Sequence, residues 1–68
     1  MKKQYKEYCI IYKDSDEFYT TNEEESEKVF EENKDKIRQY FIKDWIYNTK
    51  IKKYEYEEEH VKIIYQNL

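Results

Sequence analysis

Three residue types are missing from this 68-residue chain, which has no glycine, no proline and no alanine. Glycine lets a backbone take a positive φ or approach a ligand closely, so glycine-rich phosphate loops, dinucleotide-binding turns and nucleophile elbows cannot form. The missing residues have GC-rich codons, whereas the abundant Lys, Ile, Asn and Tyr have AT-rich codons. We therefore predict a gene from an AT-rich genome, that of a low-GC bacterium or its phage.

Cysteine and histidine are scarce, with one residue of each, Cys9 and His60. A lone cysteine cannot form a disulfide within the chain, and it is typical of proteins in a reducing cytoplasm. A structural zinc site takes about four Cys or His ligands. We therefore expect no metal site of that kind and no cofactor.

The sequence offers little for catalysis. Cys9 lies in an apolar stretch, where a thiol is more often an inert small hydrophobe than a nucleophile. A Cys9–His60 pair needs the two side chains to be adjacent in space, which nothing in the sequence indicates. Carboxylate pairs such as Glu57 and Glu59 can act as acid and base, but sixteen acidic residues make such pairs unavoidable. We predict that the protein is not an enzyme.

Long apolar runs are also missing. No run approaches the about 20 residues that span a bilayer, and polar residues follow the first methionine, so we expect neither a membrane span nor a signal peptide. Charged residues make up 43% of the chain, yet the net charge is only −3, and aromatic residues make up 19%. This balance favours a folded chain. The prediction is one small cytoplasmic domain spanning residues 1–68.

A domain of this size buries only about 60% of its unfolded surface, so its stability is marginal. With no disulfide and no zinc site, we expect an aromatic core or oligomerisation to supply the stability. Nine Tyr, three Phe and one Trp make an aromatic core credible.

The first third of the chain predicts a β-hairpin. Residues 5–12 are rich in aromatic and β-branched side chains, as are residues 17–21, and both segments are therefore expected to be strands. Residues 13–16 form the expected turn, in which an Asp replaces the missing glycine because Asp tolerates the left-handed conformation and hydrogen-bonds nearby backbone.

The middle of the chain predicts one amphipathic helix that begins after Asn22 and ends near Asn48. Asn22 is a good N-cap with Glu25 at the capping-box position, and acidic residues precede basic ones as the helix dipole prefers. At 100° per residue, one face collects the side chains of Val29, Phe30, Ile37, Tyr40 and Phe41. A break into two shorter helices near Asn33 is the alternative.

The last third of the chain fits two periods. Tyr54 and Tyr56 alternate as in a strand, and so do Val61, Ile63 and Tyr65, which predicts a second hairpin. A helical period through Val61, Ile64, Tyr65 and Leu68 is the alternative. The predicted fold is therefore α+β, a ββαββ arrangement with one amphipathic helix packed on an antiparallel sheet, or ββαβα if the C-terminal segment is helical.

Two features of the predicted helix suggest a surface for a partner. Its solvent side carries Glu24, Glu31 and Asp35, which either form an ordinary solvated face or resemble a row of phosphates. Ile42 and Ile46 lie opposite the core stripe with Trp45 between them, so the end of the helix is apolar nearly all round. Either a partner or second copy covers this end, or the helix stops before Ile46 and returns it to the core.

These residues predict a non-enzymatic protein–protein interaction or regulatory module, which we expect to be a homo-oligomer and an accessory protein of a phage or mobile element. Its partner would be another protein. The alternative is a nucleic-acid-associated protein whose sheet face presents the residues Tyr54, Tyr56, Lys50 and Lys52. The acidic residues beside these lysines and the pI of about 5.2 weigh against that alternative.

Overall fold

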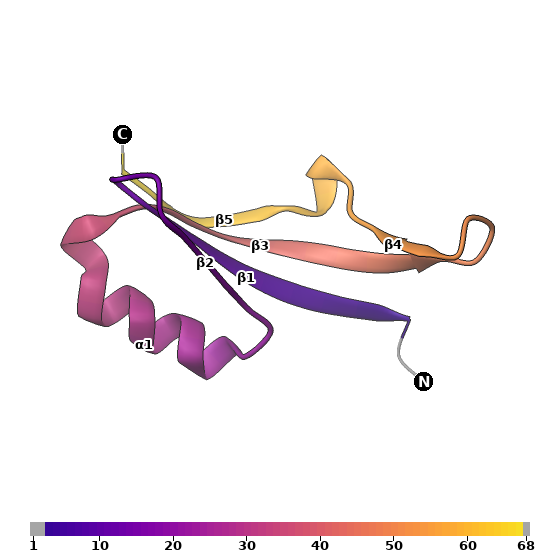
Figure 1. Ribbon diagram of the computed structural model, residues 1–68, viewed down its shortest axis with the longest axis horizontal. Coiled ribbons are helices and arrows are strands. Elements are labelled where there is room, and N and C mark those ends of the chain that lie inside the picture. Colours follow the sequence, from indigo (N-terminus) through magenta and orange to yellow (C-terminus); the bar gives the residue numbers. More distant parts are fainter. Residues whose placement is uncertain (1–2, 68) are drawn as a thin grey trace.

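A computed structural model describes residues 3–67, so Met1, Lys2 and Leu68 of the predicted domain lie outside the described residues. One helix accompanies one antiparallel sheet, which confirms the α+β class (Figure 1). The order is ββαβββ rather than ββαββ. The elements are β1 (Gln4–Tyr12), β2 (Glu17–Thr20), α1 (Glu23–Asn33), β3 (Ile37–Asn48), β4 (Lys53–Glu55) and β5 (Lys62–Gln66), with short 3₁₀ turns η1 (Lys34–Lys36) and η2 (Glu58–His60).

The long strand β3 is the centre of the sheet. The strand order is β2-β1-β3-β4, and β5 also pairs with β3. Because β1 occupies one edge of β3, β4 and β5 share the other edge, where β4 pairs with residues 46–48 and β5 with residues 39–42. The helix α1 connects β2 to β3 across β1.

The predicted first hairpin is confirmed. In β1 and β2, Tyr8 pairs with Thr20 and Ile10 pairs with Phe18. The turn differs in one detail, because Ser15 rather than an Asp takes the left-handed conformation, with φ of 76°. Asp14 still supplies the expected local hydrogen bond, since its Oδ1 accepts from the Asp16 backbone N–H at 3.0 Å.

The predicted helix begins where expected and ends early. Asn22 Oδ1 accepts a hydrogen bond from the Glu25 backbone N–H at 2.9 Å, as an N-cap does. The helix ends at Asn33, whose side-chain amide donates to the Val29 carbonyl at 2.9 Å. The predicted end near Asn48 is therefore wrong. The expected alternative break near Asn33 occurs, but it leads into a strand and not into a second helix.

Removing the N-cap is expected to destabilise the protein by about 1 kcal/mol. In the variant Asn22→Ala, the Glu25 backbone N–H loses its acceptor while the rest of α1 is unchanged. Urea unfolding followed by circular dichroism measures the change. An unchanged midpoint would show that the helix does not depend on this cap.

Residues 37–48 form a strand because both of their faces are covered with β-branched and aromatic side chains. Alternation sends Tyr40 and Ile42 towards α1, and it sends Phe41, Trp45 and Tyr47 to the opposite face. Residues 41–46 carry apolar side chains in both directions, which predicted a helix that is apolar all round. In the structure this is the pattern of a central strand with two apolar faces.

The core lies between α1 and the sheet. Its buried side chains are Tyr8, Ile10, Phe30, Ile37 and Tyr40. Ile42 packs against this cluster, so the premise that it lies on an outer helix face is wrong. The buried Ser26 hydroxyl hydrogen-bonds the Tyr40 hydroxyl at 2.7 Å, which connects α1 to β3.

The last third of the chain is strand and turn. β5 excludes the alternative of a C-terminal helix over residues 62–66. The predicted hairpin between β4 and β5 is wrong, because both strands pair with β3. The second hairpin instead joins β3 to β4 through residues 49–52, where Asn48 Oδ1 accepts from the Lys50 and Ile51 backbone N–H groups. Asn48 therefore organises a turn and not a helix end.

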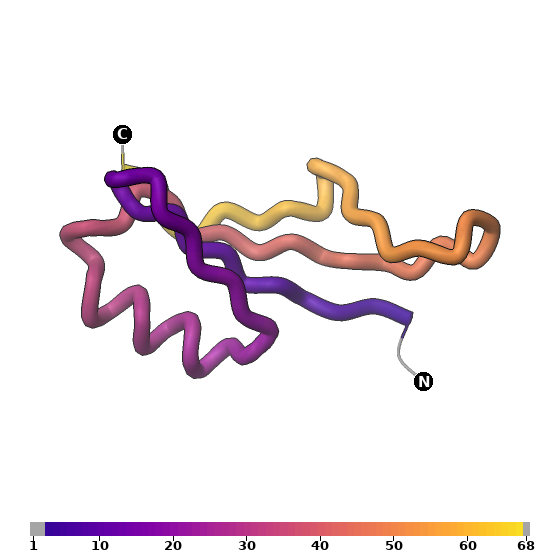
Figure 2. Tube along the Cα trace, in the orientation of Figure 1, coloured from indigo at the N-terminus to yellow at the C-terminus, as the bar shows by residue number. Residues whose placement is uncertain are grey.

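The sheet is longer than the helix that covers it. Figures 1 and 2 show α1 against the half of the sheet that holds the β1–β2 turn, whereas β1, β3 and β4 continue past the helix. The molecule measures 42 × 23 × 17 Å along its principal axes. Beyond α1, the chain is a single layer of sheet.

Candidate interaction surface

Five neighbouring aromatic side chains lie together on the sheet face that α1 does not cover, a face that also holds Tyr19 and Phe41. The register pairs Tyr5 of β1 with Trp45 of β3, and Tyr47 of β3 with Tyr54 of β4. Directly opposite residues of an antiparallel pair project from the same face of the sheet. Tyr56, just after β4, packs on Trp45. We call these five residues the aromatic face.

The rings of the aromatic face contact one another in a continuous cluster. Tyr5 stacks on Trp45 with 6.2 Å between ring centroids. Tyr54 meets both Tyr5 and Tyr47 edge to face at 5.1 Å, and Tyr56 meets Trp45 in the same way at 4.7 Å. Edge-to-face pairs at these separations are favourable, so the rings hold one another in place.

The aromatic face remains open to solvent. Tyr5, Tyr54 and Tyr56 are 38%, 42% and 38% exposed. The helix that covers the other face contacts β1, β2 and β3 through the Tyr40 side of the sheet. Among residues 3–67 the one α-helix is α1, which packs on the opposite face of the sheet from these rings.

Lys43 lies beside the aromatic face and contacts several rings. Its Nζ is 4.6 Å from the ring centroid of Tyr56 and 5.9 Å from that of Trp45. Lys3 Nζ lies 4.6 Å from the ring centroid of Tyr47. An ammonium group over an aromatic ring is attracted by the negative charge of the ring face.

Glu7 holds the only tryptophan of the chain in position. The Trp45 Nε1–H donates to Glu7 Oε1 at 3.1 Å, and Glu7 lies directly across from Lys43 in the register. A buried edge of an indole ring needs such an acceptor. The contact fixes the orientation of Trp45 at the centre of the aromatic face.

Cys9 is buried on the same side of the sheet, next to Tyr19 and Phe41 in the register. Burial raises the pKa of the Cys9 thiol to about 12, and the nearby Glu7 carboxylate adds to the effect. The thiol hydrogen-bonds the Glu7 carbonyl and carboxylate, whereas His60 contacts Glu59. The structure therefore does not bring Cys9 and His60 together.

We expect Cys9 to resist alkylation at pH 8 in the folded protein and to react once urea unfolds the chain. The reason is twofold, because the thiol is buried and its pKa lies far above that pH. Mass spectrometry after iodoacetamide treatment measures the modified fraction. The raised pKa of Cys9 stabilises the folded state, and this contribution is fully present below the ordinary thiol pKa. It is lost as the pH rises from that value towards about 12. Rapid alkylation without urea would contradict the burial of Cys9.

The residues predicted to bind a partner do not gather in one place. Ile42 packs near the core, Ile46 is exposed on the same face, and Trp45 projects from the other face. The premise that the two isoleucines flank Trp45 on a helix is therefore wrong. The acidic residues Glu24 and Glu31 lie exposed on α1 and Asp35 lies exposed in η1. Their role in binding stays a prediction.

The residues of the nucleic-acid alternative separate into two sets. Tyr54 and Tyr56 belong to the aromatic face. Lys50 and Lys52 lie in the exposed turn between β3 and β4, where Lys52 has a φ of 56°. The lysines that lie over the rings are instead Lys43 and Lys3, each with its Nζ 4.6 Å from a ring centroid, and the sequence singled out neither of them for this role.

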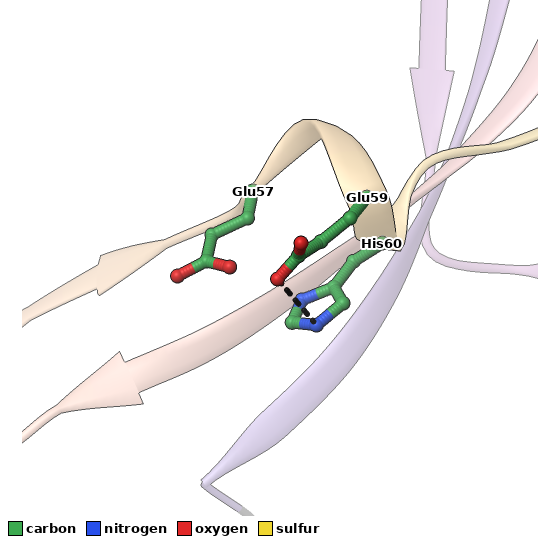
Figure 3. Close-up of side chains that lie close together, drawn as sticks. All are labelled: Glu57, Glu59 and His60. Carbon is green, nitrogen blue, oxygen red and sulfur yellow. Dashed lines mark ion pairs between the residues drawn. The ribbon is translucent and has the colours of Figure 1, made fainter.

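A second cluster, between β4 and β5, consists of Glu57, Glu59 and His60 (Figure 3). Each side chain offers one potential metal-ligand atom, and these three atoms all lie within 4.8 Å of one another. His60 Nε2 is 4.0 Å from Glu59 Oε1. A hydrogen bond with Glu59 raises the pKa of Glu57, and the repulsion between the two carboxylates raises it further. Both glutamates are exposed and have partners within the cluster, so we assign no ion to it.

Sequence reasoning missed Tyr5 and Tyr47 as members of the aromatic face. Both follow the alternation of a strand, Tyr5 with Glu7 and Cys9, and Tyr47 with Trp45. For Tyr47 the signal was hidden because residues 37–48 fit a helical period as well. The pairing of β1 with β3 is what places the two tyrosines together.

Within residues 3–67, no helix is long and apolar enough to cross a membrane. Comparisons with protein-family models, with curated proteins and with solved structures find no match to this chain. The candidate site therefore rests on the geometry and chemistry of the aromatic face.

Proposed function

We propose that this protein is a non-enzymatic interaction module that binds another protein through the aromatic face. The observation that carries the proposal is the continuous set of five rings on a sheet face that no helix covers. Tyrosine and tryptophan are enriched at the energetic centres of protein interfaces. Large exposed apolar patches on a folded chain mark interaction sites.

The surroundings of the rings support the same function. Trp45 is fixed by Glu7, and the tyrosines are held by ring contacts, so little side-chain entropy is lost when a partner binds. Rigid aromatic anchors of this kind form binding hot spots. In this proposal the protein regulates a host or viral protein by occupying one of its surfaces, as an accessory protein of a phage or mobile element.

The test is a pull-down from a lysate of the source cell with three tagged proteins. They are the unaltered chain, the double variant Tyr54→Ser with Tyr56→Ser, and the control Ile64→Ser. Ile64 is 44% exposed, similar to Tyr54, but it lies next to Phe30 and Tyr40 on the helix side. The unaltered chain and the control are expected to capture the same protein, and the double variant is expected to lose it.

Equal capture by all three tagged proteins would contradict the proposal. Circular dichroism of the double variant shows whether it has kept its fold. The lysate is divided and one half is treated with nuclease. Capture that survives nuclease supports a direct protein partner.

A second candidate function is binding of single-stranded nucleic acid. The observation that favours it is the position of Lys43, with its Nζ 4.6 Å from the ring centroid of Tyr56. Aromatic rings stack on bases, and lysines contact phosphates, in proteins that bind single strands. Against it, the rings meet one another edge to face and Glu7 lies opposite Lys43.

Fluorescence polarisation with a labelled single strand tests this second function. The affinity is expected to fall steeply with salt if lysines contact phosphates. No binding at low salt, or an affinity that does not change with salt, would exclude it. A protein captured only before nuclease treatment would favour it over the first proposal.

A further inference from the structure

We infer that the occupant of the aromatic face is a second copy of this chain, so that two sheets pack face to face with α1 of each copy on the outside. The inference rests on the proposed function, because it concerns the same site, where a host or viral protein would compete with the second copy. Three features carry the inference, namely the exposed surface of the chain, its elongated shape and the charges on this face.

The chain exposes more surface than a compact monomer of its mass. Its accessible surface is 5425 Å², whereas a monomer of 8.7 kDa exposes about 4,700 Å² on average. The excess of about 700 Å² is close to the about 800 Å² that each partner buries in a standard interface. The excess surface of the whole chain is therefore comparable to the surface that one copy would lose in such an interface.

The elongated shape of the molecule agrees with this excess of surface. The radius of gyration is 13.2 Å, against about 11 Å for a compact domain of 68 residues. The elongation arises where β1, β3 and β4 extend past α1 as a single layer (Figure 1). A sheet needs a second layer to bury its apolar face, and face-to-face packing of two sheets provides one.

The charges on this face are balanced. Its charged side chains on and next to β1, β2 and β3 are Lys3, Glu7, Glu17 and Lys43. Two lysines and two glutamates give no net charge, although the whole chain carries −3. In a two-fold dimer the same patch meets itself, so a patch with net charge would repel its copy. Two copies can therefore approach through this face without net repulsion between these four side chains.

Sedimentation velocity over a series of protein concentrations tests the inference. The unaltered chain is expected to shift from 8.7 kDa to twice that mass as its concentration rises. Tyr54→Ser with Tyr56→Ser is expected to raise the dissociation constant of the dimer at least about tenfold, because both rings leave the interface. The control Ile64→Ser is expected to leave the dissociation constant unchanged.

Lys43→Glu provides a variant that keeps every ring of the aromatic face. It changes the charge of this face from zero to −2, so each copy repels the other, and the dissociation constant is expected to rise with a strong dependence on salt. Circular dichroism at low concentration confirms the fold of each variant. A dimer that is as tight in both variants as in the unaltered chain would overturn the inference.

The outcomes separate the inference from the proposed function. A chain that is monomeric at all concentrations overturns the inference. If that monomer still captures a different protein through Tyr54 and Tyr56, the proposed function stands with another partner. If the monomer captures no protein through Tyr54 and Tyr56, the inference and the proposed function both fail.

Discussion

Ile10→Ala is expected to lower the free energy of unfolding by about 2 to 5 kcal/mol, the largest effect of any single truncation that we propose. Ile10 is fully buried in the centre of β1, with Phe18 and Tyr40 as its neighbours in the adjacent strands. Shortening the side chain removes apolar contacts and leaves a cavity that the surrounding rings fill only in part.

The consequence for such a small chain is severe. A domain of 68 residues has a total stability of only about 3 to 10 kcal/mol, so much of the Ile10→Ala protein is expected to be unfolded. Urea unfolding at a fixed protein concentration measures the loss, since a dimer would make the stability concentration-dependent. The matched control is Ile51→Ala in the β3–β4 turn, where the side chain is 51% exposed. Its change is expected to stay below about 0.5 kcal/mol, and equal losses for the two variants would contradict the placement of the core.

Ser26→Ala is expected to destabilise the protein by about 1 to 3 kcal/mol, because it leaves the buried Tyr40 hydroxyl without a partner. The Ser26 hydroxyl donates to the Glu23 carbonyl at 2.7 Å, so the Tyr40 O–H donates to Ser26 Oγ. Both side chains are buried where α1 meets β3. This hydrogen bond is therefore a direct probe of helix docking.

A double-mutant cycle separates the hydrogen bond from general packing. Tyr40→Phe keeps the ring that packs on Phe30, with 5.0 Å between centroids, and removes only the hydroxyl. Once Ser26 is Ala, the further change Tyr40→Phe is expected to cost little or to restore stability, because no unpaired hydroxyl remains. Denaturant unfolding of the four proteins gives the coupling energy. Strictly additive losses would show that the two hydroxyls do not interact.

The parts of the fold that depend on neighbouring residues were predictable from the sequence. The first hairpin follows from strand-like residues on both sides of a short polar turn. The helix start follows from Asn22, whose hydrogen bond to the Glu25 backbone N–H spans three residues. Each of these features is decided within a few positions of the chain, where local propensity is informative.

The strand β3 was not predictable in the same way. Its apolar residues satisfy a helical period together with Val29 and Phe30, and Asn33 gave the only local indication of a break. What decides in favour of a strand is pairing with distant segments, with Gln4 opposite Ile46 on one edge and Gln66 opposite Gln39 on the other. Long-range pairing therefore decides between the strand propensity of these residues and the helical period that they also fit.

The candidate site was half predictable for the same reason. Tyr54 and Tyr56 were singled out because they alternate within one short segment. Tyr5 and Tyr47 join them only through the β1–β3 and β3–β4 registers. Ile42 and Ile46 were chosen as helix neighbours of Trp45, and the strand places them on the opposite face from it. A site assembled from three strands is visible only once their register is known.

Acrylamide quenching of Trp45 fluorescence tests the central claim most directly, because the only tryptophan of the chain lies at the centre of the aromatic face. The half-buried indole is expected to be quenched readily at low protein concentration. Quenching is expected to fall, with a shift of the emission to shorter wavelength, as the protein associates between about 1 μM and about 1 mM or as a captured partner is added. Association that leaves the quenching of Trp45 unchanged would place the interface elsewhere and contradict the binding role of the aromatic face.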